Sequence, residues 1–293
     1  DAQLVKWHGR SEAPPYFRAI PVDWETISDV QVTATPQEQV NLILKKSLEN
    51  HEWRQRRCVN LIPSEMTQSS LVRLLQITDP CGRYAEHKEL LAAFEQEVFY
   101  YQGTEFIAWT EDRLVEEMKK FLGYQLVETR VISGQMANMT VFSALVDFIN
   151  RTDRRSEPRR IPLVMNNHIS KGGHLSSQPM GALRDYVAKD PVTEKYSVLN
   201  FPVLPENPYS IDLKETANLL DRFDPELIIL GKSMILHAEP VAAIRKMIEA
   251  KKTRPVIMYD MAHVLGLIGP HFQDPLAEGA DIITGSTHKT FYG

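Results

Sequence analysis

The chain has 293 residues, 43% of them hydrophobic, and a formal net charge of -5. This composition is ordinary for a soluble globular protein with one large domain, or one domain and a modest extension. The negative charge argues against an electrostatic nucleic-acid binder, and no apolar run in the sequence is long enough to span a membrane. The only cysteines, Cys58 and Cys81, imply no disulfide framework and favour a reducing, cytoplasmic compartment.

The first 35 residues are rich in proline and scattered aromatic residues and have no clear period. This is too apolar for simple disorder and fits an arm that docks on another subunit. A helix is expected next, with Thr35 as its N-cap, Pro36 in its first turn and Val40, Ile43 and Leu44 on one face. We therefore divide the chain into an N-terminal arm and helix, residues 1–58, and a large domain, residues 59–293.

Short apolar runs alternate with helical patterns through the rest of the chain. Strands are expected at 131–132, 163–165, 226–230, 256–259 and 282–283, and helices at 109–122, at 134–148 and at 241–252. Strand, helix and strand repeated in this way predict an α/β fold with a mostly parallel sheet covered on both sides.

The turn at Ser133-Gly134-Gln135 lies between a predicted strand and a predicted helix. A helix N-terminus preceded by small residues has free backbone N–H groups that point at a ligand, so this turn is a candidate anion site. Taken alone, Ser-Gly after a strand is a weak signal.

Two candidate chemical groups follow the last two predicted strands. Asp260 ends the first, and Lys289 follows the second after a cluster of small polar residues. Both are expected at the carboxyl edge of the sheet, where open α/β sheets bind their ligands. A lysine that forms a Schiff base and an aspartate that holds a pyridinium nitrogen suit pyridoxal phosphate. A capping aspartate and a solvated lysine are the alternative.

Two histidines accompany this pair. His288 is adjacent to Lys289, and His263 follows Asp260 by three residues and can reach back over the same pocket. The segments Asp260-Met-Ala-His263-Val-Leu-Gly-Leu and Thr287-His288-Lys289-Thr290, in this order, resemble serine hydroxymethyltransferase. This family consists of fold-type I pyridoxal-phosphate enzymes that interconvert serine and glycine using tetrahydrofolate. The resemblance implies a large domain built on a seven-stranded type of sheet, and no metal.

The resemblance also implies roles for individual residues. Lys289 would carry the cofactor, Asp260 would keep its ring nitrogen protonated, and His263 would orient the ring substituents. The segments that match the family's cofactor-binding segments place Ser133, Gly134 and Gln135 at the phosphate, His174 stacked on the ring, and Ser233 and His288 close to the cofactor. Ser64 matches a serine that contacts the substrate carboxylate, although taken alone it reads as a helix N-cap.

Further implied residues act across a subunit interface. Arg83-Tyr84-Ala85-Glu86 is similar to a family segment whose Tyr and Glu enter the neighbouring active site, with Glu86 as the acid–base residue. Tyr101 matches a tyrosine near cofactor and substrate. A homodimer or homotetramer with the active site at the interface, acting on a small amino acid, is therefore expected. Taken alone, Glu86 would be a surface residue.

Two departures from the family pattern leave the function open. The segment His87–Phe99, expected to be helical, is inserted before Tyr100-Tyr101, in a region that shapes the folate approach in the family. The resemblance also implies a small C-terminal domain after the large domain, and we expect that domain to be absent from this chain. Two alternatives to a serine–glycine hydroxymethyltransferase therefore stay open: a folate-independent aldolase or transaldolase on β-hydroxy amino acids, and a catalytically incomplete cofactor-binding subunit.

Overall fold

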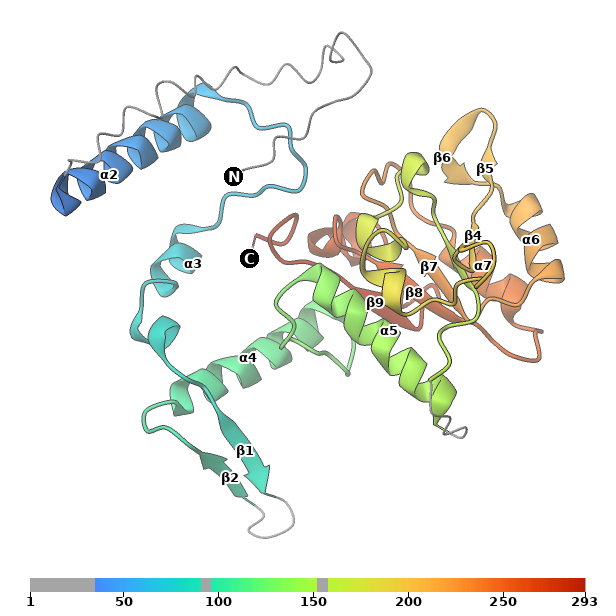
Figure 1. Ribbon diagram of the computed structural model, residues 1–293, viewed down its shortest axis with the longest axis horizontal. Coiled ribbons are helices and arrows are strands. Elements are labelled where there is room, and N and C mark those ends of the chain that lie inside the picture. The colour runs from blue at the N-terminus through green and yellow to red at the C-terminus, as the bar shows by residue number, and fades with distance from the viewer. Residues whose placement is uncertain (1–34, 91–95, 152–157, 293) are drawn as a thin grey trace. The chain divides into compact units, whose positions relative to one another are not determined.

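The computed structural model describes residues 35–90, 96–151 and 158–292 (Figure 1). The chain divides into two compact units, Asp1–Leu61 and Ile62–Gly293. The expected N-terminal arm lies outside the described residues. Within the described ranges, no helix combines the length and the apolar character that a membrane span requires.

The described part of the first unit contains helix α2, Pro36–Glu52, and a π-helical turn, η2, Trp53–Arg57. The predicted start of α2 is confirmed. The Thr35 hydroxyl accepts from Glu38 N at 3.3 Å, and Thr35 N donates to the Glu38 carboxylate at 2.7 Å, which completes a capping box. Val40, Ile43 and Leu44 are each at least 50% exposed in this chain.

The second unit is built on a five-stranded sheet with the order β4-β3-β7-β8-β9, in which all neighbouring strands are parallel. The strands are β3 (Val164–Asn166), β4 (Val198–Asn200), β7 (Leu227–Leu230), β8 (Val256–Asp260) and β9 (Ile282–Thr284). The α/β class and the parallel sheet are confirmed. The described residues contribute five strands to this sheet rather than the seven that the resemblance implied.

The two faces of the sheet carry alternate residues of each strand, as expected for a strand period of two. Helix α5, Gly134–Asn150, covers one face, where Phe142 packs with Ile229 and Met258. Helices α6, Leu213–Arg222, and α7, Val241–Ile248, cover the other face around Tyr259. Asp260 shares its side of β8 with Met258, so its carboxyl group points toward α5.

The remaining elements lie outside the five-stranded sheet. They are helices α3 (Ser70–Leu75) and α4 (Glu105–Leu122), the antiparallel pair β1 (His87–Leu90) and β2 (Gln96–Phe99), the antiparallel pair β5 (Val203–Leu204) and β6 (Asn207–Ile211), and 3-10 turns.

The structure corrects several predicted elements. Residues 131 and 132 form no strand, since Ile132 is 87% exposed and has no place in the sheet. The inserted segment is a β-hairpin and not a helix, because β1 and β2 pair over four residues and so satisfy each other's backbone groups. Ser64 caps no helix, because α3 begins six residues later and is capped by Ser69. The helix predicted to reach residue 252 ends at Ile248.

Candidate active site

The centre of the candidate site is the carboxylate of Asp260 at the carboxyl end of β8, which is 2% exposed. Its Oδ2 lies 2.6 Å from His174 Nδ1 and accepts from Asn138 Nδ2 at 2.8 Å and from Ser177 Oγ at 3.1 Å. Its Oδ1 accepts from Ala262 N at 3.0 Å. A buried charge is tolerated only with such partners, so this network holds an ionised carboxylate in the interior.

The pKa of Asp260 reflects two opposing influences. Burial, the largest single influence, disfavours the charged form, but the hydrogen bond and charge of His174 and the amide of Asn138 favour it. The result is a pKa below the ordinary value for aspartate. Asp260 is therefore a carboxylate at neutral pH and can accept a proton or a hydrogen bond from a ligand cation.

Four of the polar residues around Asp260 received no role from the sequence. Ser176 Oγ lies 2.8 Å from His174 Nδ1, and Ser177 bonds Asp260 directly. Asn138 comes from the second turn of α5, and Thr284 Oγ1 donates to its Oδ1 at 2.6 Å, which turns the amide so that its NH₂ faces Asp260. The available signal was position: the serines lie two and three residues after His174, and Thr284 ends β9 beside the end of β8.

Lys289 supplies the amine of the candidate site and is 8% exposed. Its Nζ lies 2.9 Å from Ser286 Oγ, and Ser286 in turn donates to Ala262 O at 2.8 Å, next to Asp260. Burial lowers the pKa of Lys289, and the charge of Asp260 opposes that shift only in part. A buried lysine with a lowered pKa is the form in which this amine acts as a nucleophile.

Two of the three expected histidines, His174 and His263, face each other beside this pair. The rings of His174 and His263 meet edge to face, with centroids 5.5 Å apart. Burial and the positive charges of Lys289 and His174 lower the pKa of His263 to about 4, so its imidazole is neutral at pH 7. His288 is exposed, and burial together with the charge of Lys289 lowers its pKa.

The start of α5 contains the residues of the predicted anion site. Ser133 is the N-cap, and its hydroxyl accepts from Met136 N at 3.0 Å. Gly134 lies beside the loop after β9, where an added Cβ would be in van der Waals contact, 3.4 Å from Gly285 O. Gln135 is exposed. Gly134 and Gln135 are the first two residues of a 17-residue helix, where backbone N–H groups have no partner within the helix and the helix dipole is positive.

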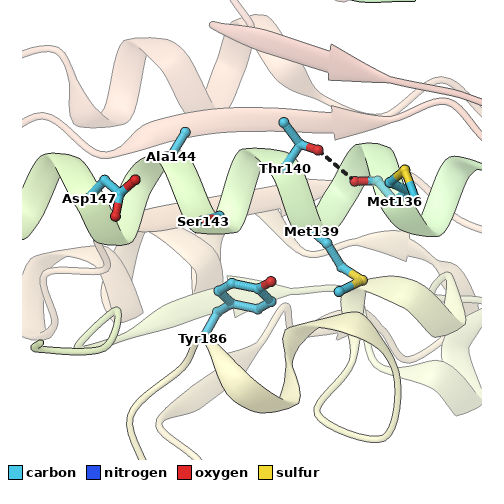
Figure 2. A pocket seen from close by; sticks show the side chains of 7 residues that line it. All are labelled: Met136, Met139, Thr140, Ser143, Ala144, Asp147 and Tyr186. Carbon is cyan, nitrogen blue, oxygen red and sulfur yellow. Dashed lines mark hydrogen bonds between the residues drawn. The ribbon is translucent and has the colours of Figure 1, made fainter. Parts of the chain in front are cut away.

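A cavity of about 620 Å³ opens beside this turn. The start of α5 and the loop after β9 form one wall, through Ser133, Gly134, Thr284, Gly285, Ser286, Thr287 and His288, and α4 contributes Leu114, Met118 and Leu122. A shallower hollow lies along α5 and involves none of the predicted residues; Figure 2 shows two of the side chains that line it, Met139 from α5 and Tyr186.

The residues expected to come from a neighbouring subunit contact one another, and the structure shows no hydrogen bond between them and Asp260 or Lys289 within the described part of the chain. The Tyr84 and Tyr101 rings stack with centroids 5.3 Å apart, and Tyr100 N donates to Glu86 O at 3.2 Å across the base of the hairpin. The insertion thus keeps Tyr84, Glu86 and Tyr101 together. All three are exposed, and among the described residues none of them bonds the Asp260 network.

The other two predicted residues are also placed. Ser64 is partly buried in a turn before α3. Ser233 is partly buried, and its backbone N–H donates to Gly172 O at 2.7 Å, which places it beside the segment that carries His174.

A parallel α/β sheet with a buried aspartate, a buried lysine and a helix N-terminus at its carboxyl edge defines the large domain of a fold-type I enzyme. A family model described as serine hydroxymethyltransferase matches residues 37–293. The chain belongs to the serine hydroxymethyltransferase family.

Curated relatives agree with this assignment. Proteins named serine hydroxymethyltransferase from Pyrobaculum islandicum and Pyrobaculum aerophilum are 36% and 34% identical over 88% and 87% of this chain, and in both the match covers 53% of the relative. The relative of the same name from Archaeoglobus fulgidus is 34% identical over 84% of this chain and 50% of its own length. The chain therefore spans about half the length of these relatives.

Proposed function

We propose that the chain binds pyridoxal phosphate and takes part in hydroxymethyl transfer between serine and tetrahydrofolate. The observation that carries the proposal is the pairing of an ionised, buried Asp260 with a buried Lys289 of lowered pKa at one edge of the sheet. A purely structural role would not require Lys289 to have a lowered pKa, because the Asp260 carboxylate already has other hydrogen-bond donors.

The residues present fit this cofactor. Its ring nitrogen needs a carboxylate partner, which Asp260 provides, and its phosphate needs N–H donors, which the start of α5 provides at Gly134 and Gln135. Ser133 and the loop after β9 line the cavity beside that turn. His174, which already bonds Asp260 at 2.6 Å, is the side chain proposed to lie against the ring.

When bound, pyridoxal phosphate supplies an aldehyde for an amine and a ring that accepts the electron pair released at the substrate α-carbon. Lys289 provides the amine, and burial keeps more of it in the neutral, nucleophilic form. Asp260 holds a proton on the ring nitrogen because its own pKa is low. His263 remains a neutral hydrogen-bonding group at pH 7 and can orient the substituents of the ring.

The remaining roles require a second copy of the chain. We propose a homodimer or homotetramer in which Tyr84, Glu86 and Tyr101 of one subunit complete the site of its neighbour. Their exposure and their shared position at the base of the β1–β2 hairpin support this arrangement. Glu86 is proposed as the acid–base group and Ser64 as a contact of the substrate carboxylate. A cytoplasmic location is proposed from the two unpaired cysteines.

The hairpin favours a second candidate function. It follows Glu86 directly, in the region expected to shape the folate approach. A folate-independent aldolase or transaldolase on β-hydroxy amino acids would use the same Lys289 and Asp260 without that approach. Because the chain spans about half of its relatives, a cofactor-binding subunit without catalysis is the third candidate.

The experiment on the cofactor is direct. Protein produced with pyridoxal phosphate should show a visible absorption band. Reduction with borohydride should attach the cofactor permanently, and peptide mass mapping should then find the pyridoxyl group on Lys289. Lys289→Ala should lose both signals. Lys251→Ala, which alters a lysine paired with Asp224 instead, is the matched control and should keep both. A colourless wild type, or labelling of another lysine, would refute the proposal.

The choice among the three functions rests on a second measurement. Exchange of the glycine α-proton with solvent is compared with and without tetrahydrofolate, and cleavage of threonine is measured in parallel. Dependence on tetrahydrofolate supports the hydroxymethyltransferase, whereas fast threonine cleavage without it supports the aldolase. Bound cofactor whose spectrum does not respond to glycine or serine supports the non-catalytic subunit.

A further inference from the structure

A buried ion pair, Lys232 and Glu239, follows the carboxyl end of β7 and has none of the roles proposed for the candidate site. Lys232 Nζ and Glu239 Oε1 are 2.8 Å apart, and each side chain is only 2% exposed. Lys232 Nζ also donates to Tyr209 O at 2.7 Å, and Glu239 Oε2 accepts from Asn167 Nδ2 at 2.8 Å. An apolar pair of similar volume often stabilises a fold as well as a buried ion pair does, so stability alone does not account for these charges.

One arm of this network reaches His174. Asn167, held by Glu239, begins the segment that carries His174, and its carbonyl accepts from Gln178 Nε2 at 2.8 Å at the other end of that segment. The backbone of Lys232 also forms a β-bridge with Gly173, the residue before His174. An added Cβ at Gly173 would lie 2.1 Å from Asn167 O, so this segment is tightly folded. Lys232 and Glu239 thus contact the segment at two points, Asn167 through the Glu239 side chain and Gly173 through the Lys232 backbone, both of which precede His174.

The other arm reaches Asp260. Glu239 N donates to Gln273 Oε1 at 3.0 Å, and Gln273 Nε2 donates back to Glu239 O at 2.6 Å. Tyr259 OH donates to the same Gln273 Oε1 at 2.9 Å, and Tyr259 is the residue before Asp260 on β8. Glu239 is therefore the point at which the hydrogen bonds of both elements meet.

We propose that Lys232 and Glu239 are positioning residues that hold the His174 segment against β8 and so maintain the 2.6 Å contact between His174 and Asp260. The Lys232 ammonium holds the Glu239 carboxylate through Oε1, and the other carboxylate oxygen, Oε2, accepts the hydrogen bond that holds the Asn167 side chain. The effect on cofactor affinity rests on the proposed function, but the effect on the geometry of His174 does not.

The test uses two double variants of the full chain. Lys232→Met/Glu239→Leu removes both charges and the acceptor for Asn167 while leaving no buried charge unpaired. Lys232→Met/Glu239→Gln also removes both charges but keeps a side-chain oxygen that can accept from Asn167. Arg245→Met is the control for general destabilisation. Arg245 bonds Asp281, which accepts from Ile257 N at the start of β8, the end of the strand opposite Asp260.

The first readout is the ¹⁵N resonance of His174 Nδ1, assigned with a His174→Gln variant and recorded without cofactor. The second is the dissociation constant for pyridoxal phosphate. We expect the Leu variant to shift the Nδ1 resonance and to bind about tenfold more weakly, the scale seen when groups that orient a ligand-binding histidine are removed from metal sites. The Gln variant should stay within about threefold of wild type, because an amide oxygen can replace the carboxylate as acceptor. The Arg245 control should lower the melting temperature and leave the His174 resonance in place.

A folded Leu variant with the wild-type Nδ1 resonance would overturn the proposal and leave the pair a purely structural feature. If the Leu variant does not fold, Asn167→Ser removes the same side-chain amide and is judged by the same two outcomes. A wild type that binds no pyridoxal phosphate would refute the proposed function, while the His174 resonance would still decide the positioning role.

Discussion

His263 offers a prediction in which the effect of pH follows from the structure. Burial and the positive charges of Lys289 and His174 lower its pKa from the ordinary 6.5 to about 4. Well above pH 6.5 the imidazole is neutral in both the folded and the unfolded chain, so its titration does not change the free energy of unfolding. As the pH falls from 6.5 toward 4, the unfolded chain binds a proton that the folded chain does not, so stability is lost in this window.

The size of the loss follows from the two pKa values. With values of 6.5 and about 4, linkage gives a loss of about 2 kcal/mol at pH 5 and almost none at pH 7.5. His263 is only partly buried, and solvent screening reduces the effect. We therefore expect about 1 to 2 kcal/mol from this single histidine at pH 5.

The assay compares wild type with His263→Gln, which cannot titrate. Urea unfolding is measured at pH 7.5, 6.5 and 5.0, and the difference in unfolding free energy between the two proteins is followed against pH. The variant should gain about 1 to 2 kcal/mol relative to wild type between pH 7.5 and pH 5.0. His271→Gln, at an exposed position, is the control for the loss of one histidine. A difference for His263→Gln that stays constant with pH would refute the reasoning.

Two further predictions concern the support of Asp260. Thr284→Val should lower the unfolding free energy by about 1 to 3 kcal/mol, because the buried Asn138 Oδ1 loses its 2.6 Å donor; a loss below about 0.5 kcal/mol in urea unfolding would contradict this. Gly231→Ala should cost several kcal/mol and markedly lower the melting temperature, because its φ is +102° and a Cβ would lie 2.1 Å from Asp260 O. Gly82→Ala, where a Cβ meets nothing within 4 Å, is its control, and equal melting temperatures for the two variants would disprove the clash.

The central strands could be predicted from sequence because each is a short, continuous apolar run, which ends before Gly231 in β7 and at Asp260 in β8. Because both faces of the sheet are buried, apolar and polar residues do not alternate along these strands. Their uniformly apolar residues therefore reveal β7 and β8 in the sequence. The position of Asp260 at the edge follows from the end of such a run. The same approach failed at residues 131 and 132, because two apolar residues before a helix are equally compatible with an exposed loop.

The hairpin at His87–Phe99 could not be predicted for a different reason. Its backbone pairing joins residues up to twelve positions apart, from His87 to Phe99, and local propensity does not report a partner at that distance. The same pairing kept Tyr84 and Tyr101 stacked despite the insertion between them. A resemblance read along the sequence alone could not establish that contact.

By itself, the order of residues determined the class of fold, the edge of the sheet that carries chemistry, and the pair Asp260 and Lys289, because these depend on local runs and on the direction of parallel strands. Only the tertiary structure decided which side chains satisfy Asp260. Asn138 and Thr284 are 146 positions apart, yet they meet at 2.6 Å because α5 packs across the end of β9. The ionisation of a buried carboxylate depends on such neighbours, and folding alone brings them together.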